Sequence, residues 1–140
     1  MAATVLHVVV DAANVVGSRP DGWWRDRGGA ARSLAGRLAA VLAEDPGRLA
    51  DALGRPGTDL RVHLVLEGAA RVADLPTHPH LDVVLAEADG DAAIADLATD
   101  LAAAPYADVV VVTADRALRT RVVDAGATTA GPHTLQNALP

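Results

Sequence analysis

The chain lacks cysteine and has almost no aromatic residues. Its 140 residues include no Cys and no Phe, with one Tyr and two Trp. Without thiols, disulfide scaffolds, thiolate zinc sites, iron–sulfur clusters and cysteine nucleophiles are excluded. Surfaces that bind nucleic acid by stacking many bases on aromatic rings are nearly excluded as well.

Lysine is also missing, because all twelve basic residues are Arg. Walker-type phosphate loops, Schiff-base enzymes and receiver domains each need a lysine and are therefore ruled out. Fifteen Asp and three Glu give a net charge of −6, which argues against strong non-specific binding of nucleic acid. The apolar run at 5–10 is too short to span a membrane and has no basic flank before it, so we expect a cytoplasmic protein without a membrane partner.

The chain is 51% hydrophobic, which is enough for one packed domain, and we expect this domain to cover 1–140. Nearly continuous, Val-rich runs at 4–10, 61–66, 81–86 and 108–113 predict strands buried on both faces, and 127–130 predicts a short last strand. Helical stripes lie at 34–42, 94–101 and 118–125, the last followed by Gly126 as a helix C-cap. Segments 18–29 and 44–59 are expected as loops, with a short helix possible at 46–53. The pattern predicts an α/β fold, a three-layer Rossmann-like sandwich with a mainly parallel sheet.

Acidic residues follow the ends of four predicted strands. In order along the chain they are Asp11, Glu67, Asp89 with Asp91, and Asp115. Ligands of open parallel sheets bind at the carboxyl ends of the strands, so these side chains are candidate site groups. Converging carboxylates repel one another unless a hard cation lies among them, which predicts a Mg²⁺ or Mn²⁺ site.

Each of these acids also has a purely structural interpretation. Asp91 and Asp115 stand at helix starts and could simply be N-caps. Asp11 has no capping role evident from the sequence, because it directly follows an apolar strand. Acids at the ends of four different strands favour the metal site over coincidence.

Two other kinds of chemistry are excluded at the first strand. A haloacid-dehalogenase-type phosphatase needs a second Asp two residues after the first, where this chain has Ala13. A dinucleotide site needs a Gly-rich turn, and none follows the strand. The remaining possibility is a carboxylate cage that holds one or two divalent ions for phosphodiester cleavage.

Four segments, in this order, carry a resemblance to a known family: residues 8–17 (VVVDAANVVG), 63–68 (HLVLEG), 90–94 (GDAAI) and 111–116 (VVTADR). The chain resembles the NYN domain of the PIN-like nuclease superfamily, close to the YacP-like ribonuclease branch. The resemblance implies a PIN-like fold over almost the whole chain.

The resemblance also implies site residues. By position, Asp11, Asp91 and Asp115 are the catalytic, metal-binding carboxylates. Asn14 orients the turn after the first strand or contacts a substrate phosphate, and Glu67 is an accessory acid. The chain departs from the family at Ala12, where Gly is usual, and at Ala92, where a second acid is common; Asp89 could supply that charge.

Basic and aromatic residues near the predicted strand ends are candidates for contacts with RNA. The arginines are Arg19, Arg25, Arg27, Arg71, Arg116 and Arg119, which could bind a phosphate backbone or lie solvated at the surface. Trp23 and Trp24 could stack on bases, contact a protein, or cap the core beneath the first long helix.

The sequence therefore predicts a metal-dependent endoribonuclease that acts on RNA. A binding module for RNA or protein that has lost turnover is an alternative, as is a nucleotide phosphatase or pyrophosphohydrolase. A homodimer, or a ribosomal or RNA-processing partner, is left open.

Overall fold

Five parallel strands form the centre of the protein. The computed structural model describes residues 4–68 and 74–140. The strand order is β3-β2-β1-β4-β5, and the bounds are β1 (Val5–Asp11), β2 (Asp59–Leu66), β3 (Leu81–Leu85), β4 (Ala107–Val112) and β5 (Thr128–Ala130). Val8 of β1 pairs with Val62 of β2 and Val110 of β4, which places the carboxyl ends of these strands at one edge.

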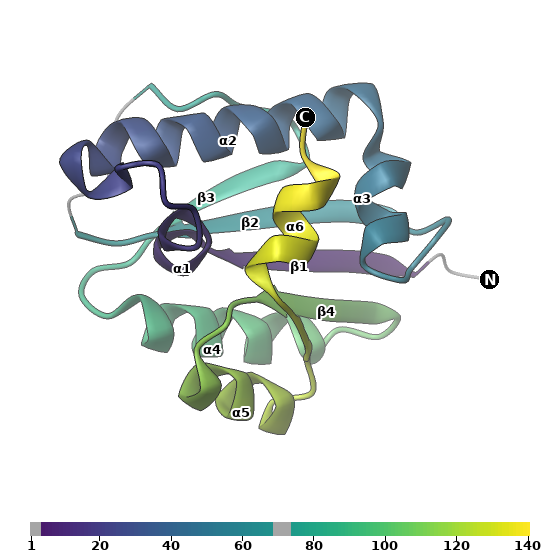
Figure 1. Cartoon of the computed structure of the whole chain (residues 1–140). Helices are drawn as coiled ribbons and strands as arrows, with labels where there is room; N and C mark the ends of the chain where they lie inside the picture. Colours follow the sequence, from purple (N-terminus) through teal and green to yellow (C-terminus); the bar gives the residue numbers. More distant parts are fainter. Residues whose placement is uncertain (1–3, 69–73) are drawn as a thin grey trace.

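Helices cover both faces of this sheet (Figure 1). On one face lie α2 (Arg27–Glu44), α3 (Pro46–Ala52) and α6 (Pro132–Ala138). The other face is covered by α4 (Gly90–Ala102) and α5 (Arg116–Asp124). A short helix, α1 (Ala12–Gly17), follows β1 directly, and a 3-10 turn, η1 (Trp23–Arg25), precedes α2. The predicted three-layer α/β sandwich is confirmed.

Alternating valines of the central strands fill two separate cores. Val8 and Val10 belong to the cluster under α2, whereas Val9 and Val111 pack toward α4 and α5. All four side chains are fully buried. A strand covered on both faces needs apolar residues at every position, which explains the continuous Val runs in the sequence.

Helix ends account for most differences from the predicted elements. Segment 18–29 was wrongly expected to be all loop, because the Asp26 side chain accepts a hydrogen bond from Gly29 N and α2 begins at Arg27. The helices α1 and α6 were not predicted, since six or seven residues show too little of a 3.6-residue period. The end of α5 is confirmed: Gly126 has φ 101° just beyond it, a conformation that glycine adopts without strain.

The short helix at 46–53 is confirmed as α3. Among the described residues, no helix combines the length and the apolar character that crossing a bilayer requires. The predicted contact residue Arg71 lies outside the described part of the chain.

Candidate active site

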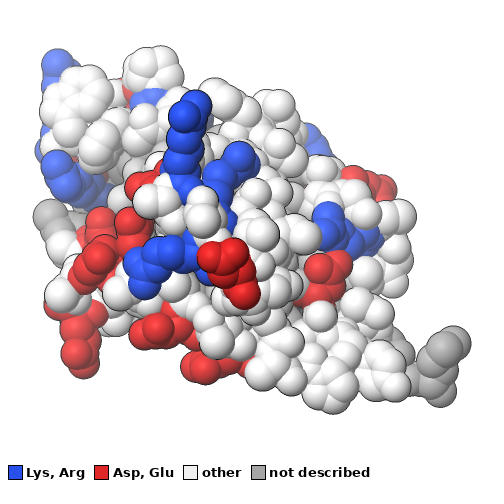
Figure 2. All heavy atoms as spheres, turned by 90° about the horizontal axis from the view of Figure 1, so that it is seen from below, with Lys and Arg blue, Asp and Glu red and all other residues white. Residues whose placement is uncertain are grey.

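The five predicted acids lie at or just beyond the carboxyl edge of the sheet, and we call them the acid rim: Asp11, Glu67, Asp89, Asp91 and Asp115. Asp11 is the last residue of β1, Glu67 follows β2, and Asp115 precedes α5. Asp89 and Asp91 flank Gly90 at the start of α4. Figure 2 shows acidic side chains gathered at the end of the molecule where Figure 1 draws α1, with arginines beside them.

Asp11 is the most deeply placed member of the acid rim, at 8% exposed. The Thr113 hydroxyl donates to its Oδ2 at 2.9 Å, and the backbone N–H of Asn14 donates to its Oδ1 at 3.3 Å. Burial raises the pKa of Asp11, the two hydrogen bonds oppose that rise, and the charges of Asp91 and Glu67 add to it. Asp11 is also the N-cap of α1, a role that was not evident from the sequence. The helix it caps was too short to be seen in the sequence.

Thr113 joins Asp11 to Asp115 and was missed as a site residue. Besides donating to Asp11, its hydroxyl oxygen accepts a hydrogen bond from the backbone N–H of Asp115 at 3.2 Å. The Thr113 side chain is fully buried. A threonine is unremarkable in a strand, and the available signal was its place as the first polar residue after four consecutive valines.

Asn14 forms a second link between the ends of β1 and β4. Its Oδ1 accepts a hydrogen bond from the backbone N–H of Ala114 at 2.8 Å, across 100 positions of sequence. Asn14 therefore fixes the turn after β4 against α1. Asp115 caps α5, as its structural interpretation predicts, by accepting from Leu118 N at 3.0 Å.

The remaining three acids lie around the start of α4. Glu67 Oε2 accepts a hydrogen bond from Gly90 N at 2.5 Å. Asp89, not Asp91, is the N-cap of α4, and its Oδ1 accepts from Asp91 N at 2.9 Å. Burial raises the pKa of Asp91, and the charges of Asp115, Asp89 and Glu67 raise it further, while Arg121 opposes them. Members of the acid rim from different strand ends therefore interact electrostatically.

The acid rim fits a hard divalent cation in its chemistry, because it offers only carboxylate oxygens. The carboxylates of the acid rim are farther apart than the ligands of an assembled metal site. Within residues 4–68 and 74–140, no three His, Asp or Glu side chains lie close enough together to hold one ion in their present positions. The structure thus brings the five acids to one edge, and closing them around an ion would require side-chain rotations.

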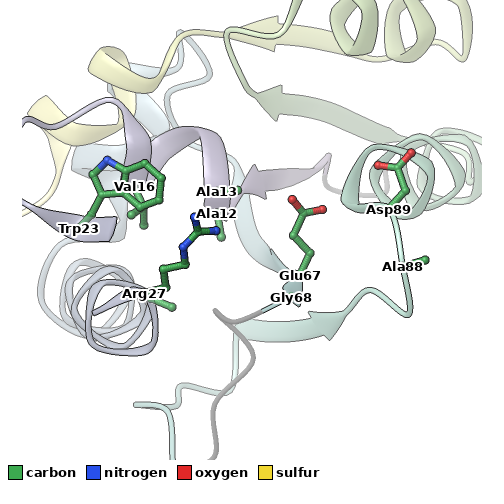
Figure 3. A pocket seen from close by; sticks show the side chains of 10 residues that line it. Ala12, Ala13, Val16, Trp23, Arg27, Glu67, Gly68, Ala88 and Asp89 are labelled. Carbon is green, nitrogen blue, oxygen red and sulfur yellow. The ribbon is translucent and has the colours of Figure 1, made fainter. Parts of the chain in front are cut away.

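A pocket of about 400 Å³ opens beside the acid rim (Figure 3). Glu67 and Asp89 stand on one side of it, and Trp23 and Arg27 on the other. The guanidinium carbon of Arg27 lies 5.3 Å from the centroid of a Trp23 ring, a cation–π distance. Sequence reasoning named both residues without placing them in one cavity.

The predicted substrate-binding arginines occupy different surroundings. Arg119 Nε donates to the carbonyl oxygen of Thr113 at 2.9 Å, so this side chain also supports the β4 end. Arg19 pairs with Asp21 at 3.8 Å. Arg25 lies against the Trp24 ring at 5.8 Å, and Arg116 is exposed at the start of α5.

Comparison with known proteins adds information about the fold. The crystal structure of Rae1 (YacP) from Bacillus subtilis, solved as a W164L mutant, superposes with a TM-score of 0.67 at 18% sequence identity. The match covers 94% of this chain and 72% of that one. The chain has a YacP-like fold. No protein-family model and no curated protein matches the sequence. This likeness is one of fold, and it agrees with the α/β sandwich built on five parallel strands.

Proposed function

We propose that the protein is a metal-dependent endoribonuclease whose active site is the acid rim. The observation that carries the proposal is the coupling of Asp11 and Asp115 through the buried hydroxyl of Thr113, with Asp91 close enough for its pKa to respond to Asp115. The YacP-like fold and the resemblance of four segments to the YacP-like ribonuclease branch support RNA as the substrate.

Asp11, Asp91 and Asp115 would hold Mg²⁺ or Mn²⁺, with Glu67 or Asp89 as an accessory acid. When bound, the ion would supply a hydroxide nucleophile and stabilise the charge that develops as the phosphodiester bond breaks. The protein's part is to fix the position of the Asp11 carboxylate, because the Thr113 hydroxyl and the Asn14 N–H both donate to it. These hydrogen bonds favour the charged form, which a cation requires.

Exposed arginines would position the RNA strand beside these acids. Arg25 and Arg116 are accessible for phosphate contacts, and Arg19 and Arg119 have donor groups beyond those that bind the chain itself. Contacts of this kind fix the register of a nucleic acid without reading its sequence. Arg116→Ala should accordingly weaken RNA binding and make it less sensitive to salt.

The test is cleavage of a mixed RNA pool by the purified chain in EDTA, in Mg²⁺ and in Mn²⁺. We expect products only with a divalent ion, and none from Asp115→Asn. Asp45→Asn is the matched control, because Asp45 also caps a helix by accepting an N–H, from Arg48 at 3.2 Å, and lies outside the acid rim. Equal loss in both variants, or cleavage in EDTA, would contradict the proposal.

A second candidate is hydrolysis of free nucleotides, which the volume of the pocket beside Glu67 and Asp89 favours. This function would release phosphate or pyrophosphate from mononucleotides. Measuring both products alongside RNA fragments distinguishes the two functions. Binding of RNA with neither reaction would instead indicate a module that has lost turnover.

A further inference from the structure

We propose that the pocket beside the acid rim binds a single unpaired nucleobase of the RNA strand, stacked on the Trp23 and Arg27 wall. This inference rests on the proposed ribonuclease function and adds how the strand is positioned. The flanking phosphodiester would then lie beside Glu67 and Asp89, the two members of the acid rim that line the pocket.

The aromatic wall is held in place from two sides. Trp23 is half-buried and lies beside α1, since a Cβ placed on Gly17 would make an ordinary contact with its ring at 3.6 Å. Arg27, in the first turn of α2, lies over the same indole. Planar nucleobases stack on both indole rings and guanidinium groups, which gives this wall two suitable surfaces.

The rest of the lining leaves room for a ring. Ala12, Ala13, Ala31 and Ala88 contribute only methyl groups, and Val16 adds a short branched side chain. The volume of about 400 Å³ lies in the range of about 300–1,000 Å³ that is typical of small-molecule pockets. A nucleoside is a ligand of this size class.

The polar groups of the pocket favour a base over an apolar side chain of a protein partner. Glu67 and Asp89 present carboxylates opposite the indole, and these accept hydrogen bonds from the amino or imino groups of a base. An apolar side chain would remove water from the two carboxylates and from the Arg27 guanidinium without offering them a new hydrogen-bond partner, which is costly. A base offers donors at its edge and an apolar face for the indole.

Trp24 serves as an internal control because it is the only other tryptophan. It is 56% exposed, does not line the pocket, and its ring stands at 89° to that of Trp23. The two indole N–H groups give separate signals in a ¹H–¹⁵N NMR spectrum, assigned with Trp23→Phe and Trp24→Phe. Titration with the four nucleoside monophosphates, which contain no internucleotide bond to cleave, should shift the Trp23 signal saturably and leave that of Trp24 nearly unchanged.

Kinetics with RNA provide the second arm. Trp23→Leu should lower kcat/KM for RNA roughly tenfold or more, the range measured for loss of base stacking, whereas Trp24→Leu should change it little. Because Trp23→Leu could loosen the fold, a second variant tests the pocket without changing the indole. Ala13→Leu narrows the pocket from an exposed position of α1, and Ala117→Leu, at an exposed position of α5, is its control. Mn²⁺ affinity should be the same in all four variants.

The outcomes separate this inference from the proposed function. Nucleotide binding at Trp23 with no RNA cleavage by the wild type supports a base site and rejects the ribonuclease. Metal-dependent cleavage with no shift at Trp23, and with equal kinetics for each variant and its control, overturns the base pocket and leaves the ribonuclease in place.

Discussion

The two halves of the acid rim differ in how firmly they are built. In the β1–β4 half, Asp11, Asn14, Thr113 and Asp115 are linked across two strand ends by side-chain hydrogen bonds of 2.8–3.3 Å. In the β2–α4 half, Glu67 is bonded to Gly90 N and Asp89 to Asp91 N, both at the start of α4. The pocket opens beside this second half.

This difference indicates that the two halves have different roles. Groups that must keep a fixed geometry toward an ion benefit from rotamers locked by their neighbours, as in the β1–β4 half. A wall that admits substrate needs free space and adaptable side chains, as in the β2–α4 half. We therefore expect substitutions in the β1–β4 half to affect chemistry and stability more, and substitutions of Glu67 and Asp89 in the β2–α4 half to affect substrate handling.

The largest effect should come from removing carboxylates of the β1–β4 half. Asp11→Asn and Asp115→Asn should each lower the single-turnover cleavage rate by about 100-fold or more, because both act on the same developing charge. Glu67→Gln should cost clearly less. The double variant Asp11→Asn/Asp115→Asn should be little worse than either single variant, and independent multiplicative losses would argue against one shared site.

Loss of the buried hydroxyl between these acids should have the next largest effect. Thr113→Val keeps the side-chain volume but removes the hydroxyl that donates to the buried Oδ2 of Asp11, which should lower the free energy of unfolding by about 1–3 kcal/mol. Thr120→Val, on the exposed surface of α5, is the matched control and should change it by less than about 0.5 kcal/mol. Urea unfolding measures both, and Thr113→Ser should restore most of the loss. Equal midpoints for the two valine variants would show that the Thr113 bond contributes nothing.

In the β2–α4 half, Gly90→Ala should produce a smaller, mainly kinetic effect. A Cβ at Gly90 would collide with Glu67 Oε2, so the carboxylate would have to move away from the start of α4. Gly36→Ala in α2 is the control, since its Cβ would make an ordinary contact of 3.5 Å with Pro76 and should stabilise the helix by up to about 1 kcal/mol. Cleavage rates should fall a few-fold for Gly90→Ala and stay constant for Gly36→Ala. Unchanged rates in both would exclude a role for the position of Glu67.

The smallest effect concerns pH. The folded-state pKa of Asp91 is raised above 3.8, chiefly by burial and then by Asp115, Asp89 and Glu67. Stability linked to this group is fully present below the unfolded pKa and is lost as pH rises through the folded pKa. In EDTA, Asp91→Asn should therefore melt higher than the wild type at pH 7, and the difference should vanish near pH 4. Asp96→Asn, on the exposed side of the same helix, should show no such trend; a melting difference for Asp91→Asn independent of pH would contradict the assignment.

Much of this architecture could be predicted from the sequence. Continuous Val runs identified the parallel strands, and acids placed after those runs identified the edge where Asp11 and Asp115 lie. The prediction that the strand at 81–86 is buried on both faces was wrong, because β3 is an edge strand and its Leu85 is 48% exposed. These signals are local, because burial of a strand on both faces forces an apolar residue at each position. The rule that parallel strands end at one edge then brought residues distant in sequence together.

What the sequence could not provide depends on side-chain geometry. The bond from Ala114 N to Asn14 spans 100 positions, and no spacing rule points to it. Likewise, Thr113 looks like an ordinary strand residue until its two partners are placed around it. The pocket arises because α1, η1 and α2 bring Trp23 and Arg27 opposite Glu67. The sequence predicted 18–29 as a loop, so neither η1 nor the start of α2 was available to place these two residues.

The most direct test of the central claim is a crystal of the wild-type chain soaked in millimolar Mn²⁺, with an anomalous difference map collected to locate the ion. The account predicts a peak at the acid rim with carboxylate oxygens of Asp11 and Asp115 among its ligands, and the loss of that peak in Asp11→Asn crystals. A map with no peak at the acid rim, or with one that persists in Asp11→Asn, would contradict a metal site at this edge of the sheet.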